Sequence, residues 1–276
     1  MKKILLFVLI GMAGLSFGQK KEKIKGNKEV LIKKFLLPDF DRIKVGEKFE
    51  VELKKAVDTT RVVIETDDNL FDVIHFEVVN KELSFYTTRE IVKKKRLRIT
   101  VYVPSYLNYM EVLEKGKIYN EESLTFHKLE IQAFDRGKTD LILDLKESLQ
   151  LNAANKTKVN LDITAPFVEI FTNDDAQTGI KASVAQMSIL QNDHSNVNIK
   201  GDGKEVEINT NDKSRFEGES FVIEKALIIA KDKTKTYINS NKELTIIAKG
   251  DSNVFIYNQP EINLKAFEDH AVLYKK

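Results

Sequence analysis

Pairs of basic side chains recur along this chain at a spacing suited to binding an extended anion. A five-residue cassette occurs nine times between Glu114 and Val272, at intervals of 18 to 21 residues, and in five copies its second and fourth positions are both Lys or Arg. Such columns could hold a sulfated or carboxylated polysaccharide, because its charges repeat along the chain. A solvated ridge that limits aggregation is the alternative. The candidate residues are Lys115, Lys117, Arg136, Lys138, Lys156, Lys158, Lys213, Arg215, Lys233 and Lys235.

Acidic residues at the first cassette position offer a second kind of chemistry. Their carboxylates could bind Ca²⁺ from neighbouring repeats, although Asp also suits a turn by bonding to nearby backbone, and no known calcium-loop spacing is present. We therefore expect no metal and no cofactor. These residues are Asp135, Asp174, Asp193, Asp212, Asp232 and Glu268.

Nucleophilic catalysis is not indicated. Asp193, His194 and Ser195 are triad residue types, but consecutive residues of an extended chain point to alternate faces and cannot form a relay. His194 and His270 lie four repeats apart, which is too far to share a metal, while His75 and His127 lie in strand-like segments. The chain contains no Cys, which excludes disulfides and thiolate chemistry. We predict that the protein is not an enzyme.

The elements that position these residues follow from alternation on both sides of each cassette. Apolar residues stand six and four positions before the first cassette residue, as Val168 and Ile170 do before Asp174. They return four and six positions after it, as Val159 and Leu161 do after Asn155. That pattern predicts a strand, a corner and a strand in every repeat. The third position is small from Gly116 to Ser252, with His270 as the exception in the last repeat, as expected inside a sharp bend.

The predicted fold is therefore all-β: a right-handed parallel β-solenoid of about nine coils over residues 106–276, because a repeat near 20 residues cannot bury an apolar face alone. Residues 35–105 alternate with period two and should form a β-rich cap, with one short helix capped by residues 66–68. The run 93–98 is strongly basic and should form a soluble hairpin crown, with anion binding as the alternative.

The N-terminus predicts export. Lys2 and Lys3 precede an apolar stretch and a small-residue cleavage site, so residues 1–18 are typical of a signal peptide. Residues 19–34 are Lys-rich and are predicted to be a solvated leader or linker. No later stretch is apolar enough to span a membrane. Without the signal peptide the chain has 42 basic and 42 acidic residues, a balance that disfavours nucleic acid as a partner.

Several segments together resemble the auto-transporter adhesin head domains, called head GIN domains, over residues 35–276. They are the signal peptide, the opening Phe40–Val45, the strand Leu97–Pro104, the serial corners and the closing Tyr257–Pro260. That family usually carries Gly-Ser-Gly at its corners and Gly where Asn258 stands here. The resemblance implies a β-helical, non-enzymatic protein of the periplasm or cell surface, and it supplies no functional residues.

The favoured function is thus an exported, non-catalytic cell-envelope interaction protein that presents stacked β-coil faces to an acidic glycan or to an envelope protein. One alternative is a carbohydrate-active enzyme, since parallel β-helices also host polysaccharide lyases and hydrolases. Those enzymes need a walled groove with paired carboxylates, whereas the repeats here leave little room for insertions. A carrier of lipids or small ligands would need an internal cavity. The sequence leaves open the ligand, the oligomeric state and the choice between periplasm and cell surface.

Overall fold

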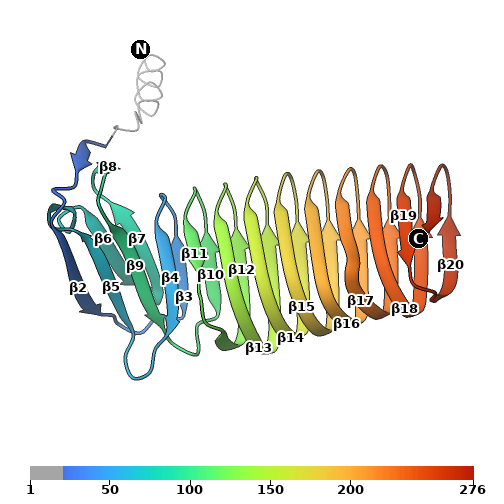
Figure 1. Ribbon diagram of the computed structural model, residues 1–276, viewed down its shortest axis with the longest axis horizontal. Helices are drawn as coiled ribbons and strands as arrows, with labels where there is room; N and C mark the ends of the chain where they lie inside the picture. Colours follow the sequence, from blue (N-terminus) through green and yellow to red (C-terminus); the bar gives the residue numbers. More distant parts are fainter. Residues whose placement is uncertain (1–20) are drawn as a thin grey trace, which may run out of the picture.

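The computed structural model describes residues 21–276, so the predicted signal peptide lies outside the described part of the chain. β-strands stack side by side in one row, and a broader group of strands covers the N-terminal end of the row (Figure 1). Over residues 21–276 the one helical element is a 3-10 turn, η1 (Asp68–Leu70). The prediction of a parallel β-solenoid with a β-rich N-terminal cap is confirmed.

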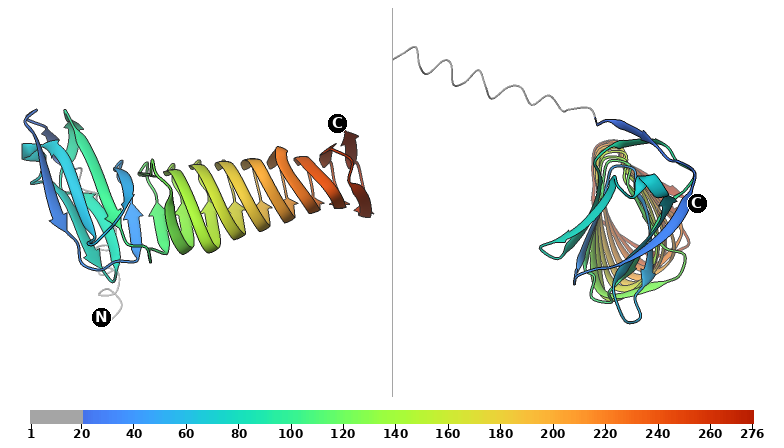
Figure 2. Two further views of the ribbon diagram at one scale, coloured as in Figure 1. Left: turned by 60° about the horizontal axis from the view of Figure 1, so that its bottom comes forward. Right: turned by 90° about the vertical axis from the view of Figure 1, so that its left-hand side faces the viewer.

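Each central coil is one long strand that runs from corner to corner and bends midway. Neighbouring coils pair in parallel and in register, so that Leu151 lies beside Ile170 and Ile170 beside Ile189. Alternate side chains point inward and are buried along the whole row, and the end view in Figure 2 shows the coils overlying one another as a flattened ring. The coil strands are β10 (Tyr109–Val112), β11 (Lys117–Tyr119), β12 (Leu124–Ala133), β13 (Lys138–Ala153), β14 (Lys158–Thr172), β15 (Gln177–Gln191), β16 (Asn196–Thr210), β17 (Arg215–Ala230), β18 (Lys235–Ala248), β19 (Asn253–Tyr257), β20 (Glu261–Phe267) and β21 (Val272–Lys275).

The corners are tight turns that begin with a left-handed residue. The first cassette residue has a positive φ, for example 55° at Asp174 and 58° at Asp193, a conformation that Asp and Asn tolerate better than most residues. The amide of Ala176, at the third position, donates to the carbonyl of Asn173 at 3.2 Å and closes the turn. A side chain on Gly116 would place its Cβ 2.5 Å from the carbonyl oxygen of Val45 in the preceding coil. The third position is small because it faces the preceding corner.

The last cassette lies one residue later than the sequence pattern suggests. Asn253 pairs with Val272, so the left-handed first residue is Asp269, with φ 59°, and not Glu268. A register irregularity in β20, near Lys265, adds the extra residue. The third position is therefore the buried Ala271, and His270 is no exception to the rule of small residues.

A tenth corner precedes the nine that the sequence indicates. β3 (Arg42–Val45) and β4 (Glu50–Lys55) pair in parallel with β10 and β11, and the turn between them has positive φ at Glu47 and Lys48. The solenoid thus begins at residue 42, and the cap is inserted between its first two coils, which corrects the expected boundary at residue 106. The cap contains β5 (Arg61–Asp67), β6 (Ile74–Val79), β7 (Glu82–Thr87), β8 (Glu90–Lys93) and β9 (Leu97–Val103).

Residues 21–34 of the segment expected to be a solvated leader belong to the cap. β1 (Lys23–Lys25) pairs with β8, and β2 (Val30–Leu36) pairs antiparallel with β5 along its full length. Alternation is weak in these strands because β2 lies at the outside of the cap, where most of its side chains remain exposed. Lysine-rich composition therefore marks an edge strand here.

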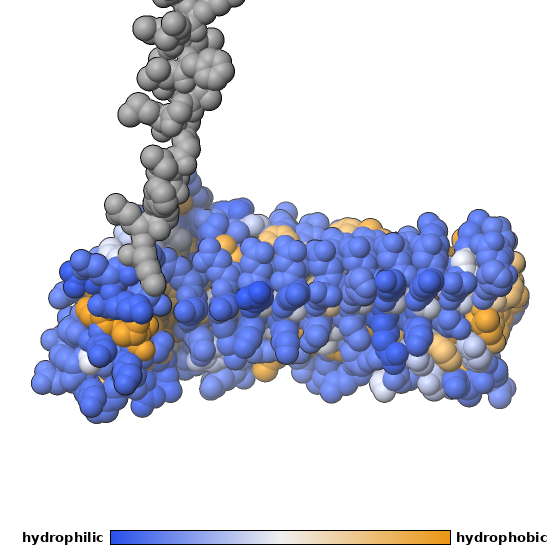
Figure 3. All heavy atoms as spheres, turned by 90° about the horizontal axis from the view of Figure 1, so that it is seen from above, coloured by the Kyte–Doolittle hydropathy of each residue, from blue (hydrophilic) through white to orange (hydrophobic). Residues whose placement is uncertain are grey.

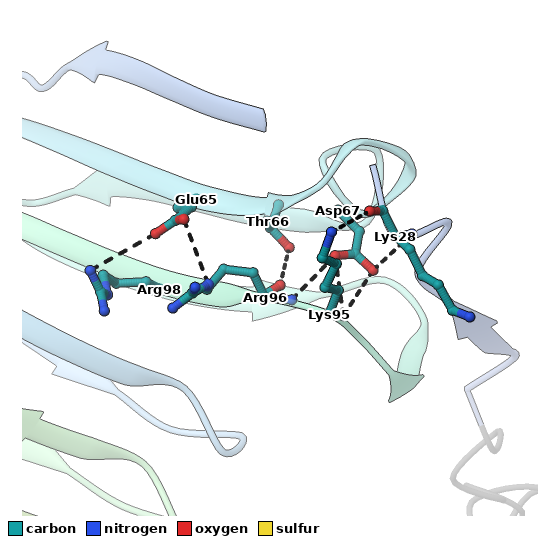
Figure 4. A network of polar contacts seen from close by, with 7 residues as sticks. All are labelled: Lys28, Glu65, Thr66, Asp67, Lys95, Arg96 and Arg98. Atoms are coloured by element: carbon teal, nitrogen blue, oxygen red, sulfur yellow. Dashed lines mark hydrogen bonds and ion pairs between the residues drawn. The ribbon is translucent and has the colours of Figure 1, made fainter. Parts of the chain in front are cut away.

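Asp67 fastens this outer layer (Figure 4). Its carboxylate is fully buried and accepts the backbone amides of Lys28 at 3.3 Å, Lys95 at 3.0 Å and Arg96 at 3.2 Å. Burial by itself would raise the pKa of Asp67, but these amides lower it below the ordinary value. The Asp67 side chain makes no capping hydrogen bond to η1, and the expected helix is a single 3-10 turn.

Candidate functional site

The predicted basic residues lie on the long edge formed by the corners. Fourth-position residues of adjacent coils pair directly, as Lys117 does with Lys138 and Lys138 with Lys158, so like charges repeat about every 4.8 Å. Figure 3, which looks down on this edge, shows a mostly hydrophilic surface along the coils. The elements that position these side chains are the turns and the first residues of the strands that follow them.

The structure divides the ridge into two blocks. Between Lys158 and Arg215 the same column contains Gln177 and Asn196, and Asp175 takes the second position of its corner. We call the residues on either side of this interruption the first and the second basic block. The first block spans three consecutive coils and contains Lys115, Lys117, Arg136, Lys138, Lys156 and Lys158; the second spans two and contains Lys213, Arg215, Lys233 and Lys235.

Some of these cations are already neutralised. Lys117 pairs with Asp140 at 3.0 Å, and Lys156 lies 3.7 Å from Asp175. Burial of Asp140 opposes its ionisation, but hydrogen bonds from Asn160 and Lys117 lower the pKa of its carboxyl overall. In the second block Arg215 pairs with Glu217.

Several other cations of both blocks remain without a partner. Their side chains are exposed and form no ion pair with any residue of 21–276. The first block therefore offers the larger continuous set of free cations. The unpaired residues are Lys115, Arg136, Lys138 and Lys158 in the first block and Lys213, Lys233 and Lys235 in the second.

The acidic column serves the turns. Asp174, Asp193, Asp212 and Asp232 are consecutive first-position residues with φ between 55° and 62°, and the carboxylate of Asp212 accepts the amide of Asp193 at 3.3 Å. Within residues 21–276 no group of three or more His, Asp or Glu side chains is arranged to hold a metal. Glu268 lies outside the column because of the register change in β20.

The four histidines lie in separate surroundings. His270 and His127 each face one carboxylate, with Nδ1 3.4 Å from Asp251 and 3.0 Å from Glu147 respectively, and His75 stacks on Tyr86 with ring centroids 5.3 Å apart. None of these contacts, within the described part of the chain, pairs a nucleophile with a base.

The basic run 93–98 is only partly available to a ligand. Arg96 and Arg98 lie 3.6 and 3.9 Å from the carboxylate of Glu65, and the backbone of Lys95 and Arg96 binds Asp67. Lys94 remains exposed and lies near Lys115 of the first block, where both line one hollow. The fold thus joins two basic features that the sequence keeps apart.

An aromatic ladder on the strands after the last corners was missed by sequence reasoning. Tyr237, Phe255 and Tyr274 stack with ring centroids 4.4 and 4.6 Å apart and interplanar angles of 8° and 10°. The sequence does contain part of this pattern, because Tyr237 and Phe255 each lie five residues after the first residue of their cassettes. Tyr274 does not fit the pattern when the last cassette is counted from Glu268, because the irregularity in β20 shifts that cassette by one residue. Because these rings cover one another's faces, the ladder is suited to stabilising the coils more than to binding a flat ligand.

Among residues 21–276 no helix is both long and apolar enough to cross a lipid bilayer.

The fold is shared with several solved structures. An adhesin described as "putative" from Parabacteroides merdae ATCC 43184 is 14% identical, with a TM-score of 0.66 over 92% of this chain and 99% of that chain. One from Parabacteroides distasonis ATCC 8503 is 14% identical, with a TM-score of 0.67 over 92% and 100%. A "putative lipid binding protein" from the same organism is 15% identical, with a TM-score of 0.61 over 92% and 100%.

A search of curated proteins found no match. The model of one family, described as "Putative auto-transporter adhesin, head GIN domain", matches residues 39–165 and 147–260. These two matches cover the first coil, most of the cap and nearly all later coils. The chain belongs to the auto-transporter adhesin head GIN domain family.

Proposed function

We propose that this protein is an exported, non-catalytic interaction protein of the cell envelope, and that it binds an acidic glycan along the first basic block. The family description, an auto-transporter adhesin head, supports binding at the cell surface as the role. The predicted signal peptide supports export. Labelling of intact cells with an impermeant reagent would distinguish the cell surface from the periplasm.

The observation that carries the proposal is the register of the first basic block. Three consecutive coils present two basic residues each at equivalent positions, in parallel strands about 4.8 Å apart. An extended polysaccharide with a regular series of carboxylates or sulfates could follow these columns along the corner edge. A folded protein partner would need a compact apolar centre to its interface, which this edge does not offer.

Binding to an array of acidic glycans at several salt concentrations tests the proposal. We expect binding that weakens with salt and falls at least tenfold, about 1.4 kcal/mol, in the variant Lys115→Gln/Arg136→Gln/Lys138→Gln/Lys158→Gln. The matched control is Lys213→Gln/Lys233→Gln/Lys235→Gln, which neutralises the second block and should bind nearly as well as the unaltered protein. Equal losses in both variants, or no acidic glycan bound, would reject the first block as the site.

The non-catalytic part of the proposal rests on the regularity of the coils. Successive corners from Asp135 to Gly250 are separated by one strand that bends midway, with no long inserted loop to wall a substrate cleft. Incubation with a panel of polysaccharides should release no new reducing ends and no unsaturated products. Release of either would establish an enzyme.

A further inference from the structure

A hollow of about 360 Å³ lies where the cap meets the first two corners. One side is formed by the corner at Glu47 and Lys48, another by the corner at Glu114 and Lys115, and the third by β8 and the residues that follow it. The volume falls within the range of small-molecule sites in proteins. The insertion of the cap between the first two coils creates this hollow, so no single repeat contains it.

Part of the inner surface of the hollow is apolar. Phe49 occupies the third position of its corner, where all later corners have a small residue, and only 3% of its surface is exposed. Its ring lies 5.9 Å from that of Phe85 in the cap. Ile91 and Leu97, both half-buried, complete the apolar lining. A hydrocarbon or ring placed here would leave water for an apolar surface.

Three acidic residues line the hollow, and Glu90 forms no ion pair with any residue of 21–276, whereas Glu47 and Glu114 make contacts within the rim. Glu47 pairs with Lys21 at 2.6 Å and accepts both the amide and the hydroxyl of Thr87, at 3.1 and 2.7 Å. Burial of Glu47 would raise its pKa, but these bonds from Lys21 and Thr87 lower it overall. The carboxylate of Glu114 accepts the amide of Glu47 at 3.3 Å. These contacts hold the two corners against the cap.

Three lysines at the rim have no such partners. Lys48, Lys94 and Lys115 are exposed and form no ion pair with any residue of 21–276. They come from two corners and from the residue that follows β8, and all three line the same hollow. The lining holds four Lys, counting Lys21, against the three Glu, so its net charge is +1, and the exposed cations outnumber the unpaired carboxylates.

We propose that this hollow binds a small amphiphilic anion, with its apolar body on Phe49, Ile91 and Leu97 and its carboxylate among Lys48, Lys94 and Lys115. A polysaccharide has no apolar body to fill the lining, and a neutral lipid would leave the lysines without a counter-charge. The inference goes beyond the proposed glycan function, because it names a different ligand class at a different place and shares only Lys115 with the first basic block.

Calorimetric titration of the purified protein with octanoate, octanol and acetate tests this inference. Octanoate carries both features of the ligand, octanol lacks the charge and acetate lacks the apolar body. We expect saturable binding of octanoate, and affinities for octanol and acetate that are at least tenfold weaker. No binding of octanoate, or equal binding of octanol or acetate, would overturn the proposal.

Two variants locate the site. Lys48→Gln/Lys94→Gln should weaken octanoate binding at least tenfold while leaving acidic-glycan binding unchanged, since the first basic block is intact. Lys213→Gln/Lys233→Gln is the control and should bind octanoate normally. Ile91→Asn should weaken octanoate binding through the apolar lining, with folding checked by circular dichroism. Unchanged affinity in Lys48→Gln/Lys94→Gln would refute the assignment, whatever the glycan result.

Discussion

Asp67 links three segments that are distant in the sequence. Its buried carboxylate joins β5 to the leader at Lys28 and to the basic run at Lys95 and Arg96. Gly26 must remain glycine, since a Cβ there would lie 1.8 Å from Oδ2 of Asp67. A charged acceptor satisfied by several backbone amides is among the stronger hydrogen-bonding arrangements in proteins.

We predict that Asp67→Asn lowers the free energy of unfolding by about 2 kcal/mol, because an amide cannot accept all of these backbone donors. Urea denaturation at pH 7 measures the loss. Asp68→Asn is the control. The Asp68 side chain is 46% exposed and its one ion pair, with Lys33 at 3.7 Å, is at the surface, so this substitution should change stability little. Equal effects of the two substitutions would contradict the role given to Asp67.

The pH dependence of this effect has a defined sign. The pKa of Asp67 is lowered by folding, so the stability from its ionised form is present above the unfolded pKa of about 3.9 and is lost as pH falls through the folded pKa. The difference between the unaltered protein and Asp67→Asn should therefore shrink on acidification below about pH 4. A difference that stays constant down to strongly acidic pH would show that ionisation is not involved.

The third corner position gives a second prediction at this scale. Ala176→Leu should destabilise the protein by about 1 to 3 kcal/mol through overpacking, because Ala176 is fully buried between two neighbouring corners. Ala271→Leu should cost less, because Ala271 belongs to the last coil, is 9% exposed and has a described neighbour on one side only. Thermal melting of both variants measures the difference, and equal losses would argue against stacking as the cause of the small residues.

At the scale of elements, the strands following the last corners gain stability from side chains on their outer face. Tyr237, Phe255 and Tyr274 form a continuous stack, and the guanidinium of Arg215 lies 4.7 Å from the centre of the Tyr237 ring. In-register parallel pairing repeats the same position in every coil, so three aromatic residues at one position must meet. The ladder thus links three successive coils through side chains that lie outside the core.

A double-mutant cycle tests the ladder. We predict a coupling energy of about 0.5 to 1.5 kcal/mol between Phe255→Leu and Tyr237→Leu. Phe167→Leu replaces Phe255→Leu in the control cycle, because Phe167 is 49% exposed and takes part in no aromatic contact with Tyr237. Absence of coupling in the first cycle would mean that the rings pack without stabilising each other.

For the whole molecule, cohesion comes from stacking of coils around one interior. The chain contains no Cys, and the cap covers the first coil by pairing β9 with β4 and β7 with β3. An inserted cap protects strand edges that would otherwise be free to pair with other molecules. The same insertion forms the hollow at the first two corners.

Metal removal gives a prediction at this scale. The melting temperature should be the same in excess chelator and in millimolar calcium, because Asp174, Asp193 and Asp212 serve turn geometry and no described carboxylates cluster around a common point. Differential scanning calorimetry measures both conditions. A clear rise of the melting temperature in calcium would show that the acidic column binds the ion.

The sequence alone determined the coils, because the residues that specify each strand and corner lie within one repeat. Alternation, a turn-forming Asp or Asn and a small third residue all fall within one repeat, as in the segment around Asp193 and Ser195. Parallel in-register stacking then follows from burying one face of every strand. The basic columns followed as well, since equivalent positions of adjacent repeats must become neighbours.

Tertiary structure alone decided everything that depends on contacts between distant segments. The tenth corner was hidden because Phe49 is large and because Glu47 and Glu114, which begin adjacent corners, are 67 residues apart in the sequence. One irregularity in β20 shifts the last cassette by one residue. Pairing with β5 makes β2 an edge strand. The carboxylate of Asp67 accepts the backbone amides of Lys28 and Lys95, which lie far from it in the sequence. No local pattern encodes such contacts, because each arises only when segments far apart in the sequence pack against one another.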